Sequence, residues 1–150
     1  MVLVGVGDTG RAVAKALEPL KLRVKLIERD REVARRLSAE FPTIEIIHGD
    51  ATEMSLLKSE RIGKDQTFVA LTGNDEGNLM SCLLAQELGV PQVLALVHRA
   101  ETTELWQRLG LQETFSPRVL ARERIEEYIA SGYSSNIVSL QSGAAQVLER

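Results

Sequence analysis

The sequence of 150 residues has a single cysteine, Cys82, and very few aromatic residues. One cysteine excludes a disulfide bond within this chain and favours a reducing compartment such as the cytoplasm. Because Phe, Tyr and Trp make up only 4% of the residues, a hydrophobic core must be built mainly from Leu, Val, Ile and Ala. At this length, such residues suffice for one domain with a substantial core.

Other features that the sequence lacks limit the functions that it can have. No apolar run approaches the roughly 18 residues that a membrane-spanning helix needs. The net charge of −3, from 18 basic and 21 acidic residues, argues against a nonspecific nucleic-acid surface, so no nucleic-acid partner is expected. His48 and His98 have no cysteine or carboxylate at the spacing of a metal site, so no metal is expected either.

The most informative stretch lies at the start of the chain, where the apolar run Met1–Val4 leads into Gly5, Gly7 and Gly10. The spacing G-x-G-x-x-G between a strand and a helix is typical of a dinucleotide-binding βαβ unit. Gly5 would allow the tight turn, Gly7 the close approach of a pyrophosphate, and Gly10 the packing of helix on strand. The helix would then present free N–H groups and a positive dipole end to the phosphates.

Two acidic residues bear on this interpretation. Glu28 ends a second apolar stretch, Leu22–Ile27, and an acid at this place accepts hydrogen bonds from the ribose hydroxyls. Its charge disfavours the 2′-phosphate of NADP, even with Arg29 beside it, so NAD(H) or an adenine nucleotide is expected. Asp8 lies within the glycine loop, where its charge opposes a pyrophosphate unless its side chain caps the helix and points away.

Strands and helices are expected to alternate through most of the chain. The expected strands are 1–4, 22–27, 44–47, 67–71, 92–97 and 113–115, and the expected helices are 8–20, 30–41, 52–57, 75–88, 102–109 and 117–131. This alternation predicts an α/β fold, namely a Rossmann-like doubly wound parallel sheet with strand order 3-2-1-4-5-6. Polar turn residues would then meet at the carboxyl ends of the strands, where such sheets bind ligands.

The sequence also predicts which side chains face the core and which cap the helices. The expected inward residues are Ala12, Val13, Ala16, Leu17 and Leu20 on the first helix and Leu79, Leu83, Leu84 and Leu88 on helix 75–88. The expected N-caps are Asp8 or Thr9, Asp30, Thr52 and Ser116, and the glycines that end helices are Gly89 and Gly110. Asp75 and Glu76 are interpreted as compensating the helix dipole, Asn78 as a surface residue, and Cys82 as core.

The sequence after the last predicted helix fits no further strand–helix unit. Residues 133–136 are polar and typical of a linker. Residues 137–140 and 145–148 have the pattern of a β-hairpin, which is only marginally stable alone. We therefore expect one domain at 1–132 and, at 133–150, a linker followed by the start of a further domain.

Several motifs occur together in a specific order. They are Gly5-Val6-Gly7-Asp8-Thr9-Gly10, Leu26–Asp30, Gly49-Asp50-Ala51-Thr52, Ala70–Asn78 and Phe115-Ser116-Pro117. In this order the chain resembles the RCK, or KTN, domains, which regulate potassium conductance, over about residues 1–131. Residues 24–29 look like the second of the two such repeats that some members carry, and the tail looks like the truncated start of the C-terminal RCK subdomain.

The resemblance implies a regulatory domain rather than an enzyme. Such a domain lies in the cytoplasm. Its partner, an integral-membrane potassium transporter subunit, holds it at the inner face of the membrane. It binds NAD(H), or in some members ATP or ADP, and gates a potassium uptake system or channel by a conformational change. The family also forms homodimers or larger rings, and helix 117–131 corresponds to its crossover helix.

The resemblance also implies a set of nucleotide-binding residues. The loop Gly5, Val6, Gly7, Asp8, Thr9 and Gly10 would hold the phosphates, and Glu28, followed by Arg29, would bind the ribose. Asp50 and Ala51 would flank the adenine, while Thr72, Gly73 and Arg99 would lie near the phosphates or the second nucleoside.

Two alternatives stay open. The chain could be the NAD-binding domain of a dehydrogenase, although it has no Tyr-x-x-x-Lys pair and no His or Lys clearly placed for proton transfer. It could also be a Rossmann repeat that has lost its ligand, an interpretation that Asp8 favours.

Overall fold

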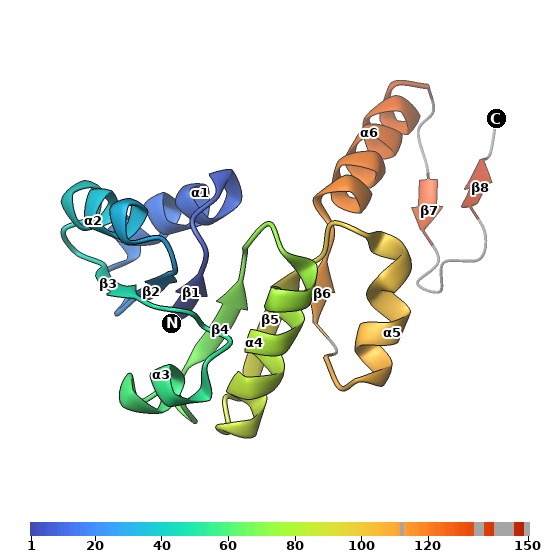
Figure 1. The fold of residues 1–150 in the computed structure, drawn as a ribbon. Helices are drawn as coiled ribbons and strands as arrows, with labels where there is room; N and C mark the ends of the chain where they lie inside the picture. The colour runs from blue at the N-terminus through green and yellow to red at the C-terminus, as the bar shows by residue number, and fades with distance from the viewer. Residues whose placement is uncertain (112, 134–136, 140–145, 149–150) are drawn as a thin grey trace. The chain divides into compact units, whose positions relative to one another are not determined.

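The computed structural model describes residues 1–111, 113–133, 137–139 and 146–148 (Figure 1). By its internal contacts the chain divides into two compact units, Met1–Ser116 and Pro117–Arg150. None of the helices in the described part is long and apolar enough to cross a membrane.

The first unit alternates strands and helices as the sequence predicts. Its elements are β1 (Val2–Val4), α1 (Asp8–Leu17), η1 (Glu18–Leu20), β2 (Lys25–Glu28), α2 (Arg31–Glu40), β3 (Glu45–His48), α3 (Met54–Ser59), β4 (Thr67–Ala70), α4 (Asp75–Glu87), β5 (Gln92–Leu96), η2 (Ala100–Thr102), α5 (Thr103–Arg108) and β6 (Thr114–Phe115). The second strand begins at Lys25 rather than at Leu22, which is exposed.

The strands form one parallel sheet in the order β3-β2-β1-β4-β5-β6. The predicted Rossmann-like strand order is therefore confirmed. Because neighbouring parallel strands lie about 4.8 Å apart, the loops that follow β1, β2, β4 and β5 converge at one edge. This edge contains the turn residues that the sequence predicts as a ligand site.

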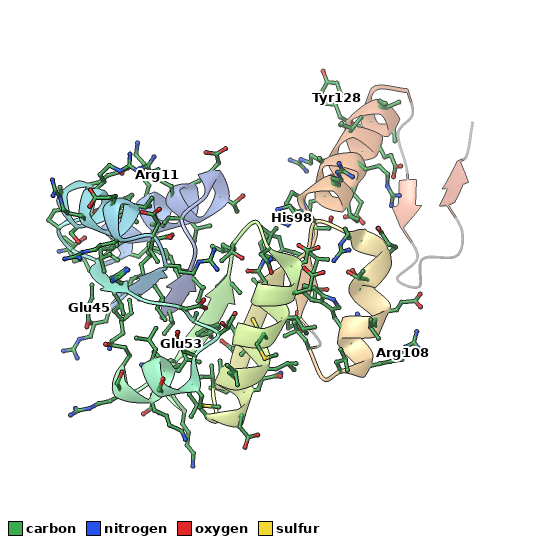
Figure 2. All side chains as sticks on the ribbon, in the orientation of Figure 1. Arg11, Glu45, Glu53, His98, Arg108 and Tyr128 are labelled. Atoms are coloured by element: carbon green, nitrogen blue, oxygen red, sulfur yellow. The ribbon has the colours of Figure 1, made fainter. Side chains whose placement is uncertain are left out.

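Helices cover both faces of the sheet. Val2 and Val4 of β1 pack in one cluster with Leu57 of α3, Cys82 of α4 and Trp106 of α5. Leu3, which points to the opposite face, packs in a second cluster with the helices α1 and α2. Figure 1 shows α1 beside α2, and an ion pair of 2.8 Å between Arg11 and Glu40 joins them (Figure 2). Because both faces are covered, the central strand β1 is apolar and buried along its whole length.

The predicted inward face of α1 is partly wrong. The helix buries Gly10 and Ala14 and half-buries Val13 and Leu17. The other residues assigned to this face, Ala12, Ala16 and Leu20, are exposed. Gly10 lacks a side chain, so α1 lies close to β1, and the helix meets the sheet along the 10-13-14-17 row.

The predicted inward face of α4 is only partly right: Leu79, Leu84 and Leu88 pack against the core cluster of this face, and Leu83 is not among them. The buried residues of this helix are Asp75, Asn78, Ser81, Cys82 and Ala85. The leucines assigned to the core, Leu79, Leu83, Leu84 and Leu88, are only half-buried. Small and polar side chains therefore separate α4 from the sheet, and Cys82 is core as expected.

Some predicted caps are confirmed and others are wrong. Asp30 caps α2 by accepting a hydrogen bond of 2.9 Å from the Val33 N–H. The α1 N-cap is Gly7, and the α3 N-cap is Glu53, and neither makes a side-chain capping bond, so Asp8, Thr9 and Thr52 are not N-caps. The Ser116 hydroxyl is buried and has no hydrogen-bond partner among the described residues, so it makes no capping bond.

The glycine-terminated helices agree with the sequence. Gly89 follows α4 with a φ of +85°, and Gly110 follows α5 with a φ of +102°. These values lie in the left-handed region that glycine adopts without a steric penalty, and both residues close their helices there.

The second unit contains α6 (Pro117–Tyr133), β7 (Ile137–Ser139) and β8 (Gln146–Leu148). The helix runs through Gly132, so the predicted linker is shorter by one residue, and residues 134–136 lie outside the described residues. β7 and β8 pair antiparallel, as the sequence predicts for a hairpin. On α6, Leu120, Ile125, Tyr128 and Ile129 are exposed.

Candidate functional site

The glycine loop begins with a turn that only glycine fits. Gly5 has a φ of +85°, and its N–H donates a hydrogen bond of 3.0 Å to the Ile27 carbonyl. A Cβ at Gly5 would lie 2.6 Å from Cγ2 and 2.9 Å from Cα of Thr72. A Cβ at Gly10 would collide with the Gly5 carbonyl oxygen. Both glycines are therefore needed for the turn and for the approach of α1 to the sheet.

Gly7 is a glycine for a different reason. A Cβ there would meet nothing within 4 Å, and its φ of −58° is open to any residue. Gly7 is the N-cap of α1 and has no side-chain cap. The first N–H groups of α1 therefore lack a side-chain acceptor, as expected of a helix end that binds an anion.

The other loop residues differ in exposure. Val6 packs against the core on the α1 and α2 face and is half-buried, as is Thr9. Asp8 is the first residue of α1 and is exposed. Asp8 does not cap the helix, and its charge in the first turn of α1 would oppose any second anion at the free N–H groups.

Glu28 and Arg29 occupy the end of β2. The carboxylate of Glu28 is half-buried, and its Oε1 accepts a hydrogen bond of 2.8 Å from the Asp30 N–H. One oxygen is therefore held in a local turn, and the other makes no hydrogen bond to a described residue. Arg29 is exposed and forms an ion pair of 3.9 Å with Asp50 Oδ2.

Asp50 and Ala51 follow β3. Asp50 Oδ1 accepts hydrogen bonds from the Thr52 hydroxyl at 2.7 Å and from the Thr52 N–H at 2.9 Å. These bonds, together with the charge of Arg29, lower the pKa of Asp50 although partial burial opposes them. Ala51 is buried in the core on the α3 and α4 face, so its methyl group packs against protein.

Thr72 is fixed by a buried amide. The Oδ1 of Asn78 accepts hydrogen bonds from the Thr72 N–H, at 3.0 Å, and from the Thr72 hydroxyl. The Nδ2 of Asn78 donates to the carbonyls of Thr72 and Leu96, each at 3.0 Å. Asn78 is fully buried, so this side chain clamps the ends of β4 and β5 together next to Gly5.

A second buried group organises the loop after β5. Asp75 is 5% exposed and accepts hydrogen bonds from the N–H groups of His98 and Arg99, at 3.0 to 3.1 Å. Its Oδ1 also contacts His98 Nδ1 at 2.7 Å. Burial alone would raise the pKa of Asp75, but the contacts with His98 and Arg99 outweigh it and lower the pKa below its ordinary value.

An open pocket of about 370 Å³ lies at this point, lined by Gly73, Asn74, Asp75, Glu76, His98 and Arg99. Asn74 caps α4 by accepting a hydrogen bond from the Gly77 N–H. Figure 2 shows His98, which comes from the loop after β5. The Arg99 guanidinium forms ion pairs with Glu76 and, at 3.8 Å, with Asp75.

Sequence reasoning missed the roles of Asp75 and Asn78. It placed Asn78 on the surface, whereas the side chain is buried, and it explained Asp75 by the helix dipole, whereas Asp75 holds the β5 loop. One signal was available: Asn74 stands directly before α4 and three residues before Gly77, the spacing of an N-cap. This cap fixes where α4 starts and thus which of its polar residues face the sheet.

The structure brings the predicted residues to one edge but in two groups. Gly5, Gly7, Thr72 and Gly73 follow the adjacent strands β1 and β4, while Glu28 ends β2 and Asp50 follows β3. No group of three or more His, Cys, Asp or Glu residues in the described ranges could hold a metal ion.

The TrkA-N domain family matches residues 1–117. The Trk system potassium uptake protein TrkA of Vibrio alginolyticus is 34% identical over 149 residues, which cover 99% of this chain and 32% of the relative. A TrkA homolog of Methanothermobacter thermautotrophicus is 30% identical over 149 residues, 99% of this chain and 68% of the relative. The chain thus spans about a third of the length of the first relative.

Solved structures share the fold. The NAD(P)-binding domain of an exopolyphosphatase-related protein from Archaeoglobus fulgidus superposes with a TM-score of 0.75 at 15% identity, covering 87% of this chain and 96% of that chain. The GsuK channel bound to NAD superposes with a TM-score of 0.70 at 22% identity, covering 81% of this chain and 22% of that chain. With the match over residues 1–117, the chain belongs to the TrkA-N domain family.

Proposed function

We propose that this chain is a nucleotide-sensing regulatory domain of a potassium uptake system. It binds NAD(H) or an adenine nucleotide, acts in the cytoplasm at the inner face of the membrane, and catalyses no reaction. Its partner is the integral-membrane transporter subunit. Support comes from the relatives named as Trk potassium uptake proteins and from the NAD-bound GsuK channel, which has this fold.

The observation that carries the proposal is the glycine loop. Gly7 leaves open space at the uncapped start of α1, and the protein's own packing gives no reason for a glycine there. A ligand whose phosphates approach the backbone explains both features. Glu28 at the end of β2 supplies the ribose acceptor, and its charge favours NAD(H) over NADP(H).

The remaining residues of the proposed site extend along the same edge. The phosphates would contact the loop from Gly5 to Gly10, and Arg99, Thr72 and Gly73 would contact the far phosphate or the second nucleoside. The adenine would lie beside Asp50 and the backbone of Ala51, with Arg29 next to them.

Regulation requires that the nucleotide bind one arrangement of the protein more tightly than another. We propose that this change passes to the transporter through a homodimer or larger ring. The exposed apolar residues Leu120, Ile125, Tyr128 and Ile129 of α6 would be covered in that assembly. The domain would extend over residues 1–132, with the C-terminal RCK subdomain beginning after it.

Substituting Gly7 by Ala tests the ligand without disturbing the fold. Gly7→Ala adds a methyl group into open space, so it causes no clash, and the free energy of unfolding should fall by no more than the ~1 kcal/mol that a poorer N-cap costs. NAD affinity, measured by calorimetry, should fall about tenfold or more, the equivalent of ~1.4 kcal/mol. Gly63→Ala is the matched control, because a Cβ there makes only an ordinary contact of 3.6 Å with the Leu88 carbonyl oxygen.

Each failure has a distinct meaning. If wild type binds none of NAD, NADH, ADP and ATP, the chain is a Rossmann repeat without a ligand, the alternative that the exposed Asp8 favours. If Gly7→Ala binds as tightly as Gly63→Ala, the nucleotide does not lie on the glycine loop.

A further inference from the structure

The edge that would hold the nucleotide is acidic. We call residues 5–10, 28–30, 48–52, 72–76 and 98–99, which follow the carboxyl ends of the strands, the carboxyl rim. Its acids are Asp8, Glu28, Asp30, Asp50, Asp75 and Glu76, and its arginines are Arg29 and Arg99. An anion that binds here meets more carboxylates than cations, the reverse of what a phosphate site usually offers.

The two arginines are already neutralised within the protein. Arg29 pairs with Asp50 at 3.9 Å, and Arg99 pairs with Glu76 and with Asp75. The carboxylate of the buried Asp75 also contacts the Nδ1 atom of the His98 ring. Asp8, by contrast, has no ion-pair partner in the part of the chain that the structure describes. Phosphates at the glycine loop would therefore meet an uncompensated carboxylate and no free arginine.

Nucleotides differ in how much charge they bring to such an edge. Each phosphate of the NAD diphosphate has one ester and one anhydride bond and carries one negative charge, and the oxidised nicotinamide ring is a cation. A terminal phosphate monoester, as in ADP and ATP, carries about −1.5 to −2 at neutral pH. The repulsion from the carboxyl rim thus increases from NAD⁺ through NADH and ADP to ATP.

We infer that this site selects its ligand by charge and binds the oxidised dinucleotide NAD⁺ in preference to NADH, ADP and ATP. The inference rests on the proposed function and specifies the ligand of the same site. Glu76 is the residue that determines the selectivity, because its carboxylate forms an ion pair with the Arg99 guanidinium, which a terminal phosphate would otherwise bind.

The geometry makes Glu76 suited to this role. It is the second residue of α4 and lines the pocket with Arg99, Gly73 and His98. Both partners of the ion pair are exposed, Glu76 by 70% and Arg99 by 55% of the side chain. The guanidinium therefore lies within reach of solvent, yet the carboxylate beside it cancels its attraction for a phosphate.

The test compares four nucleotides with wild type and Glu76→Gln. Calorimetric titrations at low salt with EDTA, which removes divalent ions, should rank wild-type affinity as NAD⁺, NADH, ADP, ATP. Glu76→Gln removes the carboxylate that pairs with Arg99 Nη2 and leaves the ion pair with Asp75 in place. An unscreened pair of charges at contact in water corresponds to about fivefold in affinity. The ATP affinity of the variant should therefore be at least about fivefold higher than that of wild type, while its NAD⁺ affinity should change by less than about twofold.

Glu87→Gln is the matched control. Glu87 is the last residue of α4, so the same loss of one charge occurs on the same helix but about 16 Å along its axis from Glu76. This variant should keep the wild-type ranking. Asp8→Asn is a second variant that should narrow the difference between ATP and NAD⁺. Raising the salt should strengthen ATP binding to wild type, because salt screens repulsion.

The outcomes separate the two proposals. If none of the four nucleotides binds wild type, both the proposed function and this inference fail. If ATP binds wild type as tightly as NAD⁺, or if Glu76→Gln leaves the ratio of the two affinities unchanged, charge selection is overturned and nucleotide binding still stands.

Discussion

Replacing Asn78 by Ala should strongly destabilise the first unit. The Asn78 side chain bonds three backbone groups, namely the Thr72 N–H, the Thr72 carbonyl and the Leu96 carbonyl, and also the Thr72 hydroxyl. It is fully buried, so water has little access to the groups that Ala would leave behind. The clamp between β4 and β5 would be lost while both strands remain.

The magnitude follows from these bonds. A buried polar group that loses its partner costs about 1–3 kcal/mol. The carbonyls keep a second lone pair and Thr72 is only half-buried, so the lower part of this range applies to each group. The sum is ~3–5 kcal/mol, a large share of the ~5–15 kcal/mol by which domains are stable.

Urea denaturation followed by far-UV circular dichroism measures this loss. With a urea slope of about 1–3 kcal/mol/M for a small domain, the midpoint should fall by about 2 M. Ser81→Ala is the matched control, since Ser81 is buried on the same face of α4 and its hydroxyl makes one bond, of 3.1 Å, to the Asn78 carbonyl. This control should cost about 1 kcal/mol.

The comparison of Asn78→Ala with Ser81→Ala tests whether the hydrogen bonds of Asn78 hold the ends of β4 and β5 together. If Asn78→Ala loses no more stability than Ser81→Ala, the Asn78 bonds do not hold the strand ends, and our reading of the clamp is wrong. A reduced slope with an unchanged midpoint would also contradict it, because it would place the effect on the unfolded chain.

Two further measurements test buried groups. The pKa of Asp75 is lowered, so its stabilising contacts are fully present above about pH 4, the ordinary pKa of an aspartate, and are lost as the pH falls through the lower native pKa. The difference in free energy of unfolding between wild type and Asp75→Asn, measured in urea, should therefore be largest near pH 7 and shrink below pH 4. A difference that stays constant with pH would contradict this prediction. Burial raises the pKa of the Cys82 thiol to about 12, so a disulfide reagent at pH 8 should label Cys82 only after unfolding in urea, and labelling of the native protein at the rate of a free thiol would show that the site opens.

The strand order could be predicted because its signals are local. Short apolar runs, the glycine turn after β1, and Gly89 and Gly110 after two helices each depend on a few neighbouring residues. Right-handed crossovers then leave few arrangements for alternating strands and helices. The structure confirms this order.

The faces of the helices could not be predicted as well, because they depend on how closely each helix approaches the sheet. Leu79, Leu84 and Leu88 of α4 do pack against the core, but the residues that α4 buries fully include Asn78, Ser81 and Cys82, which the sequence pattern does not assign to one inward face with them. Polar atoms of the strand ends need partners, and only the folded arrangement shows that a residue of α4 supplies them. For the same reason, Asp75 was assigned to the helix dipole.

The carboxyl rim therefore combines a rigid part around Thr72, held by Asn78, and a part around Arg99 whose side-chain contacts a bound ligand can change. The backbone at Gly5 leaves no room for a Cβ beside Thr72, and Asn78 ties Thr72 to Leu96. The exposed ion pair of Arg99 with Glu76 contributes little, about 0–1 kcal/mol. A ligand phosphate would thus displace this ion pair long before it moved the clamp. A conformational change on nucleotide binding should therefore begin at the Arg99 side chain and not in the glycine loop itself. The exposed ion pair of Arg99 with Glu76 is weaker than the buried bonds by which Asn78 and Asp75 hold the backbone.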